Sequence, residues 1–165
     1  MADSRSKGQR AEYAVRDLLR EATGVDWERV PGSGGFGSQH GLKGDIYLPN
    51  STGLMSRYCI EVKHYKDEHF NSNILKPTEA KSQFEKWLIQ TERESAEMNA
   101  KPMIVFKKDR GNWFVGVPTG DTILDYIEDE IIPYAIIHAS LDVQAYHIVD
   151  FKEFLNIVPL EELAK

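Results

Sequence analysis

Apolar residues recur along the chain with the period of a helix in two segments. Between residues 9 and 22 they return every three or four positions, as on one face of a helix, and Gly24 supplies a stop. A second, longer helix is predicted from Thr78 to Met98. Its apolar side is formed by Ala80, Phe84, Trp87, Leu88 and Thr91.

The segments between these helices have the short apolar runs of strands. Turn residues at 50–53 join two of these runs, so residues 45–63 are predicted to form a β-hairpin. The last third is predicted to hold an acidic helix near 121–130, a strand near 144–149 and a closing helix from 151. Earlier strands are predicted at 27–30, 45–48, 58–63, 103–106 and 113–117.

This order of elements predicts an α/β fold with a central mixed β-sheet flanked by helices. The 165 residues contain no repeat and no linker, so we expect a single domain over 1–165, with 111–165 as an acidic C-terminal part of it. No apolar run is long enough to cross a bilayer, and the polar N-terminus is not a secretory signal. Cys59 is the only cysteine, which excludes an internal disulfide, and we expect a cytoplasmic protein without membrane contact.

The net charge of −6 lies entirely in the C-terminal third. Residues 1–110 hold 18 Lys and Arg against 16 Asp and Glu, whereas residues 111–165 hold 2 against 10. Because phosphate binding needs a local basic surface and not a basic average, this balance does not exclude a nucleic-acid enzyme. The acidic part is either a solvated face that keeps the protein soluble or a surface with a role of its own.

The predicted strand at 58–63 carries the residues best suited to chemistry. Alternate residues of a strand share a face, so Glu61 and Lys63 project together, away from the apolar side. Asp45 lies beside Glu61 if the hairpin pairs in register. Two close carboxylates repel each other, and a hard divalent cation relieves that repulsion. The alternative is an exposed Glu–Lys ion pair, which is common on strands.

The order of motifs resembles the PD-(D/E)xK nuclease superfamily, whose core is restriction-endonuclease-like. Within it, the first two thirds of the chain are similar to the archaeal-type Holliday junction resolvases. The similarity rests on Lys7-Gly8, Glu12, Pro31-Gly32-Ser33-Gly34-Gly35, Gly44-Asp45-Ile46 and Ile60-Glu61-Val62-Lys63. Gly44 stands where the superfamily has the proline of its name, a change expected to affect mainly loop stiffness.

The resemblance implies a role for each residue of the motifs. Asp45, Glu61 and the Val62 carbonyl would bind the metal, Mg²⁺ with Mn²⁺ as a substitute, and Glu12 would be a further acidic residue beside it. Lys63 would be the catalytic lysine, and Ser33 would lie close to the scissile phosphate. The implied activity is cleavage of branched double-stranded DNA by a homodimer. Two alternatives stay open, a nuclease acting on other DNA and a non-catalytic nucleic-acid-binding module.

Several of the expected DNA contacts have a second interpretation. Glu12 could instead form an ion pair with Arg16, four residues further along its helix. The glycine-rich loop at 32–37 could be only a connector, and Gln83 could be only a solvated helix residue. We expect DNA binding by Lys7, Arg10, Gly32, Ser33, Gly34, Lys66 and Gln83.

Overall fold

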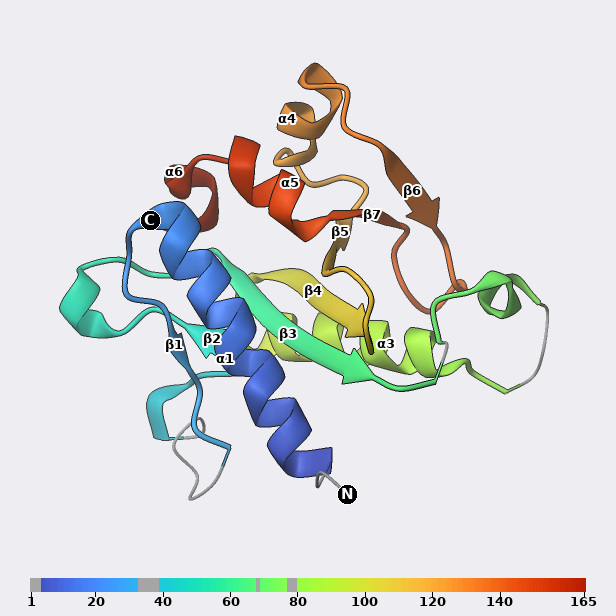
Figure 1. Cartoon of the computed structure of the whole chain (residues 1–165), viewed down its shortest axis with the longest axis horizontal. Helices are drawn as coiled ribbons and strands as arrows, with labels where there is room; N and C mark the ends of the chain where they lie inside the picture. The colour runs from blue at the N-terminus through green and yellow to red at the C-terminus, as the bar shows by residue number, and fades with distance from the viewer. Residues whose placement is uncertain (1–3, 33–38, 68, 77–79) are drawn as a thin grey trace.

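The computed structural model describes residues 4–32, 39–67, 69–76 and 80–165. In this part of the chain, seven strands form one mixed sheet in the order β1-β2-β3-β4-β5-β7-β6, flanked by helices (Figure 1). Only β3 and β4 are parallel, and the helix α3 connects them, as a parallel crossover requires. The strands are β1 (Glu28–Arg29), β2 (Ile46–Tyr47), β3 (Tyr58–Tyr65), β4 (Lys101–Lys108), β5 (Phe114–Pro118), β6 (Tyr134–Ile137) and β7 (Tyr146–Asp150).

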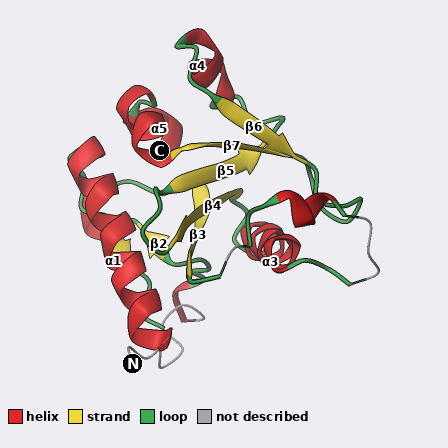
Figure 2. Cartoon of the chain, turned by 45° about the vertical axis from the view of Figure 1, so that its right-hand side comes forward, coloured by secondary structure: helices red, strands yellow, loops and turns green. Residues whose placement is uncertain are grey.

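Helices cover both faces of the sheet (Figure 2). One face packs against α1 (Ser4–Thr23) and α5 (Phe151–Ile157), and the other packs against α3 (Gln83–Glu97). Two shorter helices are α4 (Leu124–Asp129) and α6 (Leu160–Leu163), and there are 3₁₀ turns at Asn50–Thr52 and Ser72–Leu75. Among the described residues, no helix is both long and apolar enough to span a bilayer.

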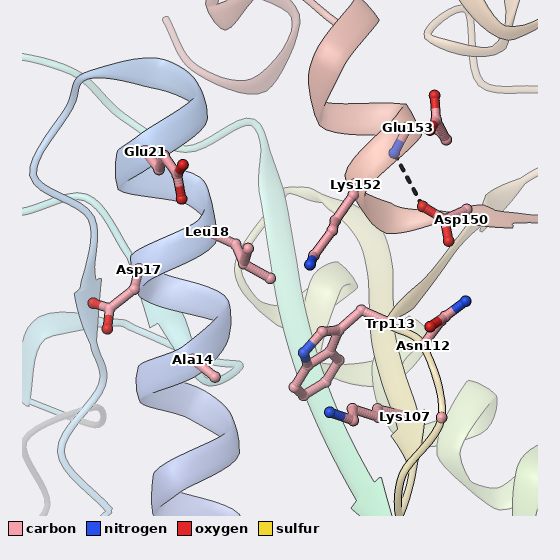
Figure 3. Close-up of a pocket in the computed structure, with 11 residues that line it drawn as sticks. Ala14, Asp17, Leu18, Glu21, Lys107, Asn112, Trp113, Asp150, Lys152 and Glu153 are labelled. Carbon is pink, nitrogen blue, oxygen red and sulfur yellow. Dashed lines mark hydrogen bonds between the residues drawn. The ribbon is translucent and has the colours of Figure 1, made fainter.

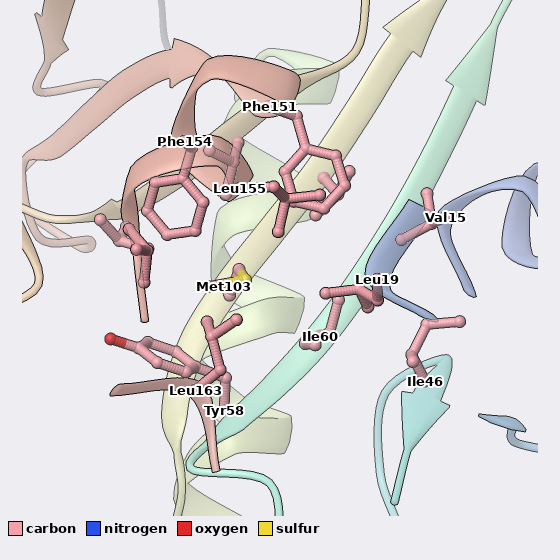
Figure 4. Packing of buried hydrophobic residues seen from close by; sticks show 14 of the residues in the cluster. Val15, Leu19, Ile46, Tyr58, Ile60, Met103, Phe151, Phe154, Leu155 and Leu163 are labelled. Carbon is pink, nitrogen blue, oxygen red and sulfur yellow. The ribbon is translucent and has the colours of Figure 1, made fainter. Parts of the chain in front are cut away.

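Alternation along β3 and β4 divides the core into two layers. Ile60 and Met103 point into the layer shared with α1 and α5, where Leu19, Phe151 and other apolar side chains surround them (Figure 4). Neighbouring strand residues point into the opposite layer, under α3. The three tryptophans, Trp27, Trp87 and Trp113, are buried.

The single-domain α/β fold predicted from the sequence is confirmed. The C-terminal part belongs to it, because β7 pairs with β5 and the backbone of Lys165 exchanges two hydrogen bonds with Met55. Two predicted helix starts are wrong. The helix predicted over 9–22 begins earlier, at Ser4. α3 begins at Gln83 and not at Thr78, because the Ser82 side chain accepts a hydrogen bond from the Glu85 N–H and caps the helix there. The edge strand β6 was not predicted.

Candidate functional site

The register of the β2–β3 hairpin brings Asp45 and Glu61 together. Ile46 pairs with Ile60, and Asp45, in a bend immediately before β2, lies against the Ile60–Val62 segment of β3. The Asp45 N–H donates to the Ile60 carbonyl at 2.7 Å, and the Asp45 Oδ2 accepts a hydrogen bond from the Val62 N–H, also at 2.7 Å. The predicted in-register hairpin is confirmed.

Gly44 fixes the backbone that leads into Asp45. Its φ is +77°, and a Cβ at this position would lie 2.8 Å from the Ile60 carbonyl oxygen. Proline is locked near a φ of −65°, so it cannot replace Gly44 in this conformation. The difference from the superfamily motif is therefore a different backbone path, and not only the change in loop stiffness that the sequence suggested.

Glu61 and Lys63 project from β3 onto the face covered by α3. The Glu61 side chain is only 3% exposed, and its Oε2 lies 3.5 Å from the Lys63 Nζ. A carboxylate this deeply buried is not the exposed strand ion pair that was the alternative interpretation, because burial of a charge has a free-energy cost that an exposed pair does not carry.

Asp45 and Glu61 hold protons more tightly than usual. Burial, together with the charge of Glu12, raises the pKa of Asp45 to about 7. Burial and the charge of Asp45 raise the pKa of Glu61 to about 10, and a hydrogen bond with Glu94 acts in the same direction. Burial also acts to raise the pKa of Glu94, but hydrogen bonds with Glu61, Gln90 and the Gly44 N–H outweigh it and lower that pKa. The negative charges are concentrated where little water solvates them.

Glu12 reaches this region from α1. Its charge raises the pKa of Asp45, so its carboxylate lies close to the Asp45–Glu61 pair. The Glu12 Oε2 accepts a hydrogen bond from the Nε of Arg29 on β1. The alternative ion pair with Arg16 is wrong, since the Arg16 guanidinium contacts Asp17 and Glu28. The spacing of residues within α1 could not predict the contact between Glu12 and Arg29, because Arg29 lies on another element, β1.

Gln90 and Glu94 of α3 also belong to the site, although the sequence did not predict them there. The Gln90 Oε1 accepts a hydrogen bond from the Lys63 Nζ at 2.9 Å, and its Nε2 donates to Glu61 and Glu94. Gln83 is exposed at the start of α3, two turns and about 10 Å along the axis from Gln90. The signal was the i, i+4 spacing of Gln90 and Glu94, which puts both on one flank of the helix.

A family of known sequences matches residues 3–165 of the chain and is described as "Phage putative PDDEXK endonuclease". The chain belongs to this family. It is also 47% identical over 165 residues to Protein D14 of Escherichia phage T5, an alignment that covers 99% of this chain and 98% of that protein. No solved structure matches. The predicted membership of the PD-(D/E)xK superfamily is confirmed, and with it a nuclease function.

Nucleases of this superfamily usually use divalent metal ions, and the donors in this chain fit such an ion. Asp45 and Glu61 are hard oxygen ligands whose mutual repulsion a divalent cation relieves. Within the described ranges, no group of three or more His, Cys, Asp or Glu side chains is arranged to hold a metal. The fit therefore rests on the Asp45–Glu61 pair, with the Val62 carbonyl as the predicted third protein ligand.

The structure brings only some of the residues predicted to bind DNA together on the surface. Gly32, Arg10 and Lys66 are exposed, and the Lys7 Nζ lies 2.6 Å from the Asp109 carboxylate. Ser33 and Gly34 lie outside the described residues. Their predicted DNA contacts, and those of Gln83, stay predictions.

A surface hollow lies on the opposite face of the sheet, between α1 and α5 (Figure 3). Trp113 and Lys107 line one side of it, and Lys152 extends from α5 toward it. Four carboxylates also line the hollow, those of Asp17, Glu21, Asp150 and Glu153. None of its lining residues belongs to the Asp45–Glu61 site.

Proposed function

We propose that this protein is a Mg²⁺-dependent, structure-selective endonuclease that hydrolyses phosphodiesters in four-way DNA junctions. The nuclease part is supported by one observation above all: the buried Glu61 lies near the half-buried Asp45, with Lys63 beside it. The preference for junctions is supported by the resemblance of the motif order to the archaeal-type resolvases, and it is the part that most needs a test.

Each residue of the site has a chemical task in this proposal. Asp45, Glu61 and the Val62 carbonyl hold the metal ion, which polarises the phosphodiester and lowers the pKa of a bound water. The Lys63 ammonium, 3.5 Å from Glu61, orients the attacking water or stabilises the charge that develops on the phosphate. Arg29 holds the Glu12 carboxylate in place near the pair. Ser33 and its neighbouring glycines are proposed to contact the scissile phosphate.

A homodimer is the proposed active form. A four-way junction must be cut on two opposed strands to be resolved, and a two-fold enzyme matches the two-fold symmetry of such a substrate. The two cuts should leave ends that a ligase can seal.

The decisive experiment compares a synthetic four-way junction with linear duplex of the same sequence in Mg²⁺. Excess linear competitor and moderate salt suppress non-specific phosphate binding, so that only recognition of shape is measured. We expect symmetric nicking of the junction and little cutting of the duplex. Equal cutting of both DNAs would favour a general nuclease, and tight junction binding without cutting in Mg²⁺ or Mn²⁺ would favour a binding module.

The active-site assignment is tested on the same substrate with Asp45→Asn, Glu61→Gln and Lys63→Ala. We expect each variant to lose cleavage. The first two should keep junction binding, because removing negative charge does not weaken attraction to phosphate. Undiminished cleavage by either carboxylate variant would overturn the proposed metal site.

A further inference from the structure

Gln90 on α3 forms hydrogen bonds with two of the proposed active-site residues, Lys63 and Glu61. Its carboxamide lies between the Lys63 ammonium and two carboxylates. The Oε1 accepts from the Lys63 Nζ at 2.9 Å, and the Nε2 lies 3.3 Å from the Glu61 Oε2 and 3.1 Å from the Glu94 Oε1. Every one of these contacts pairs a donor with an acceptor.

The chemistry around the carboxamide permits only this orientation. Rotating the amide by 180° would turn Oε1 toward the Glu61 and Glu94 carboxylates and turn the NH₂ group toward the Lys63 ammonium. Both changes would place like partial charges in contact. The surroundings therefore select one amide orientation, and the amide in turn gives Lys63 and Glu61 fixed hydrogen-bond partners.

Glu94 anchors Gln90 from one turn further along α3. Its Oε1 accepts from the Gln90 Nε2, and its Oε2 accepts from the Gly44 N–H at 3.2 Å. Gly44 immediately precedes Asp45. The same pair of α3 residues thus contacts the backbone that carries Asp45 as well as the side chains that project from β3.

Without Gln90, the Lys63 ammonium would still have the Glu61 carboxylate 3.5 Å away. The long Lys63 side chain has many accessible rotamers, and a separate acceptor helps to hold it in one place. A closer Lys63–Glu61 ion pair would occupy a carboxylate oxygen that the proposed metal site needs. Gln90 supplies an alternative acceptor for the ammonium and a donor for the Glu61 Oε2.

We propose that Gln90, held by Glu94, is a positioning residue that keeps Lys63 and Glu61 apart and correctly oriented for metal binding and catalysis. This inference rests on the proposed function of the Asp45–Glu61–Lys63 site. Gln90 acts through Lys63 and Glu61 and is not itself a catalytic residue. Groups that hold metal ligands in position typically change metal affinity or activity by about 10- to 100-fold when they are removed.

The test uses Gln90→Met, which keeps the side-chain length and removes both hydrogen-bonding functions, and Gln90→Glu, which keeps only the acceptor. Gln144→Met is the matched control, because Gln144 is an exposed glutamine before β7. Single-turnover cleavage is measured on whichever DNA the wild type cuts. We expect both Gln90 variants to lose about 10- to 100-fold in rate with KM nearly unchanged, and Gln144→Met to behave as wild type.

Two further readouts separate positioning from general structure. Mn²⁺ binding, followed by electron paramagnetic resonance without DNA, should weaken about 10-fold or more in Gln90→Met. The melting temperature in metal-free buffer should stay close to that of the wild type. Combining Gln90→Met with Lys63→Met should give a less than additive loss of rate, because the part of the Gln90 effect that acts through Lys63 is already lost in Lys63→Met.

Fully additive losses in the double variant, or wild-type rate and Mn²⁺ affinity in Gln90→Met, would overturn the inference. So would a lowered melting temperature with an unchanged rate for the folded fraction. If instead the proposed function is wrong, Asp45→Asn and Lys63→Met will retain the cleavage activity of the wild type. The Mn²⁺ measurement decides on Gln90 in either case, since it needs no DNA.

Discussion

At the scale of single residues, the buried charges of the site lower the stability of the folded protein in the absence of a metal ion. Burial and the charge of Glu12 raise the pKa of Asp45, and burial and the charge of Asp45 raise the pKa of Glu61. Perturbed carboxyl groups of this kind are typical of functional sites, because the same environment that disfavours the bare charges favours a bound cation. The protein should therefore be more stable without these charges than with them.

Asp45→Asn tests this cost directly. A carboxyl whose pKa rises on folding, here from 3.8 to about 7, stabilises the fold when protonated, and that contribution is lost as the pH rises through about 7. Without metal, the wild type should therefore melt at a lower temperature at pH 8 than at pH 5.5. The asparagine keeps an oxygen for the Val62 N–H, so the variant should melt higher than the wild type at pH 8. We expect an increase of roughly 3 °C or more, given about 2–4 °C per kcal/mol at this chain length.

Thermal melts from pH 5.5 to 8 in chelator provide the measurement. Asp26→Asn is the control, because Asp26 is exposed, and its profile should follow that of the wild type. A lower melting temperature for Asp45→Asn at pH 8 would contradict the raised pKa. Added Mg²⁺ should stabilise the wild type and have little effect on Asp45→Asn, since a ligand stabilises only the state that binds it.

Gly44→Ala tests the backbone approach to Asp45. An added Cβ meets the strain of a positive φ and a carbonyl oxygen at 2.8 Å, so Gly44→Ala should destabilise the fold by roughly 1–3 kcal/mol and reduce cleavage. Gly53→Ala is a matched control, because Gly53 has a φ of +70° and nothing within 4 Å of an added Cβ. Denaturant melts and cleavage rates of both variants measure the difference. Equal losses in the two variants would show that the contact with Ile60 is unimportant.

At the scale of elements, the sequence predicted most helices and strands because their apolar periods are regular. The hairpin register followed from alternation, since a slip by one residue would turn Ile60 toward α3 and Glu61 into the apolar layer under α1 and α5. The edge strand β6 escaped prediction because its four apolar residues are mostly exposed and show no alternation. The start of α3 was misplaced because a serine cap is a local hydrogen bond that apolar spacing does not reveal.

The residues of the site form two groups: those that are close together in the sequence, and those that only the tertiary fold brings together. Asp45, Glu61 and Lys63 were predictable because they share one hairpin. Gln90 and Glu94 reach the hairpin through the packing of α3, which brings residues 29 to 50 positions apart in the sequence into contact. The alternative interpretation of Glu12 was wrong for the same reason, because a tertiary ion pair with Arg29 on β1 forms instead of the local i, i+4 pair with Arg16.

At the scale of the whole molecule, the charges are distributed unevenly. The acidic helix α4 and the N-terminal end of α1 lie at opposite ends of the view in Figure 1. Asp125, Glu128 and Asp129 on α4, and Glu130 after it, are exposed. At physiological salt, the interaction of separated surface charges is largely screened beyond about 8 Å. The net charge of −6 should therefore have little influence on DNA that binds near Asp45.

The last prediction compares acidic and basic positions in the same binding assay. Neutralising the acidic cluster, with Asp125→Asn, Glu128→Gln, Asp129→Asn and Glu130→Gln combined, should leave junction affinity within about two-fold at physiological salt, because these charges are screened. Lys66→Ala should weaken binding and reduce the slope of log K against log salt by about 0.9, the loss of one phosphate contact. Lys165→Ala removes the same charge at the C-terminus and should change neither quantity.

Titrations between 50 and 200 mM salt provide the measurement, with Ca²⁺ in place of Mg²⁺ to hold the DNA uncut, since Ca²⁺ takes a looser oxygen shell. A large gain in affinity on neutralising α4 would show that DNA approaches the acidic end, and equal effects of Lys66→Ala and Lys165→Ala would remove Lys66 from the DNA-binding surface.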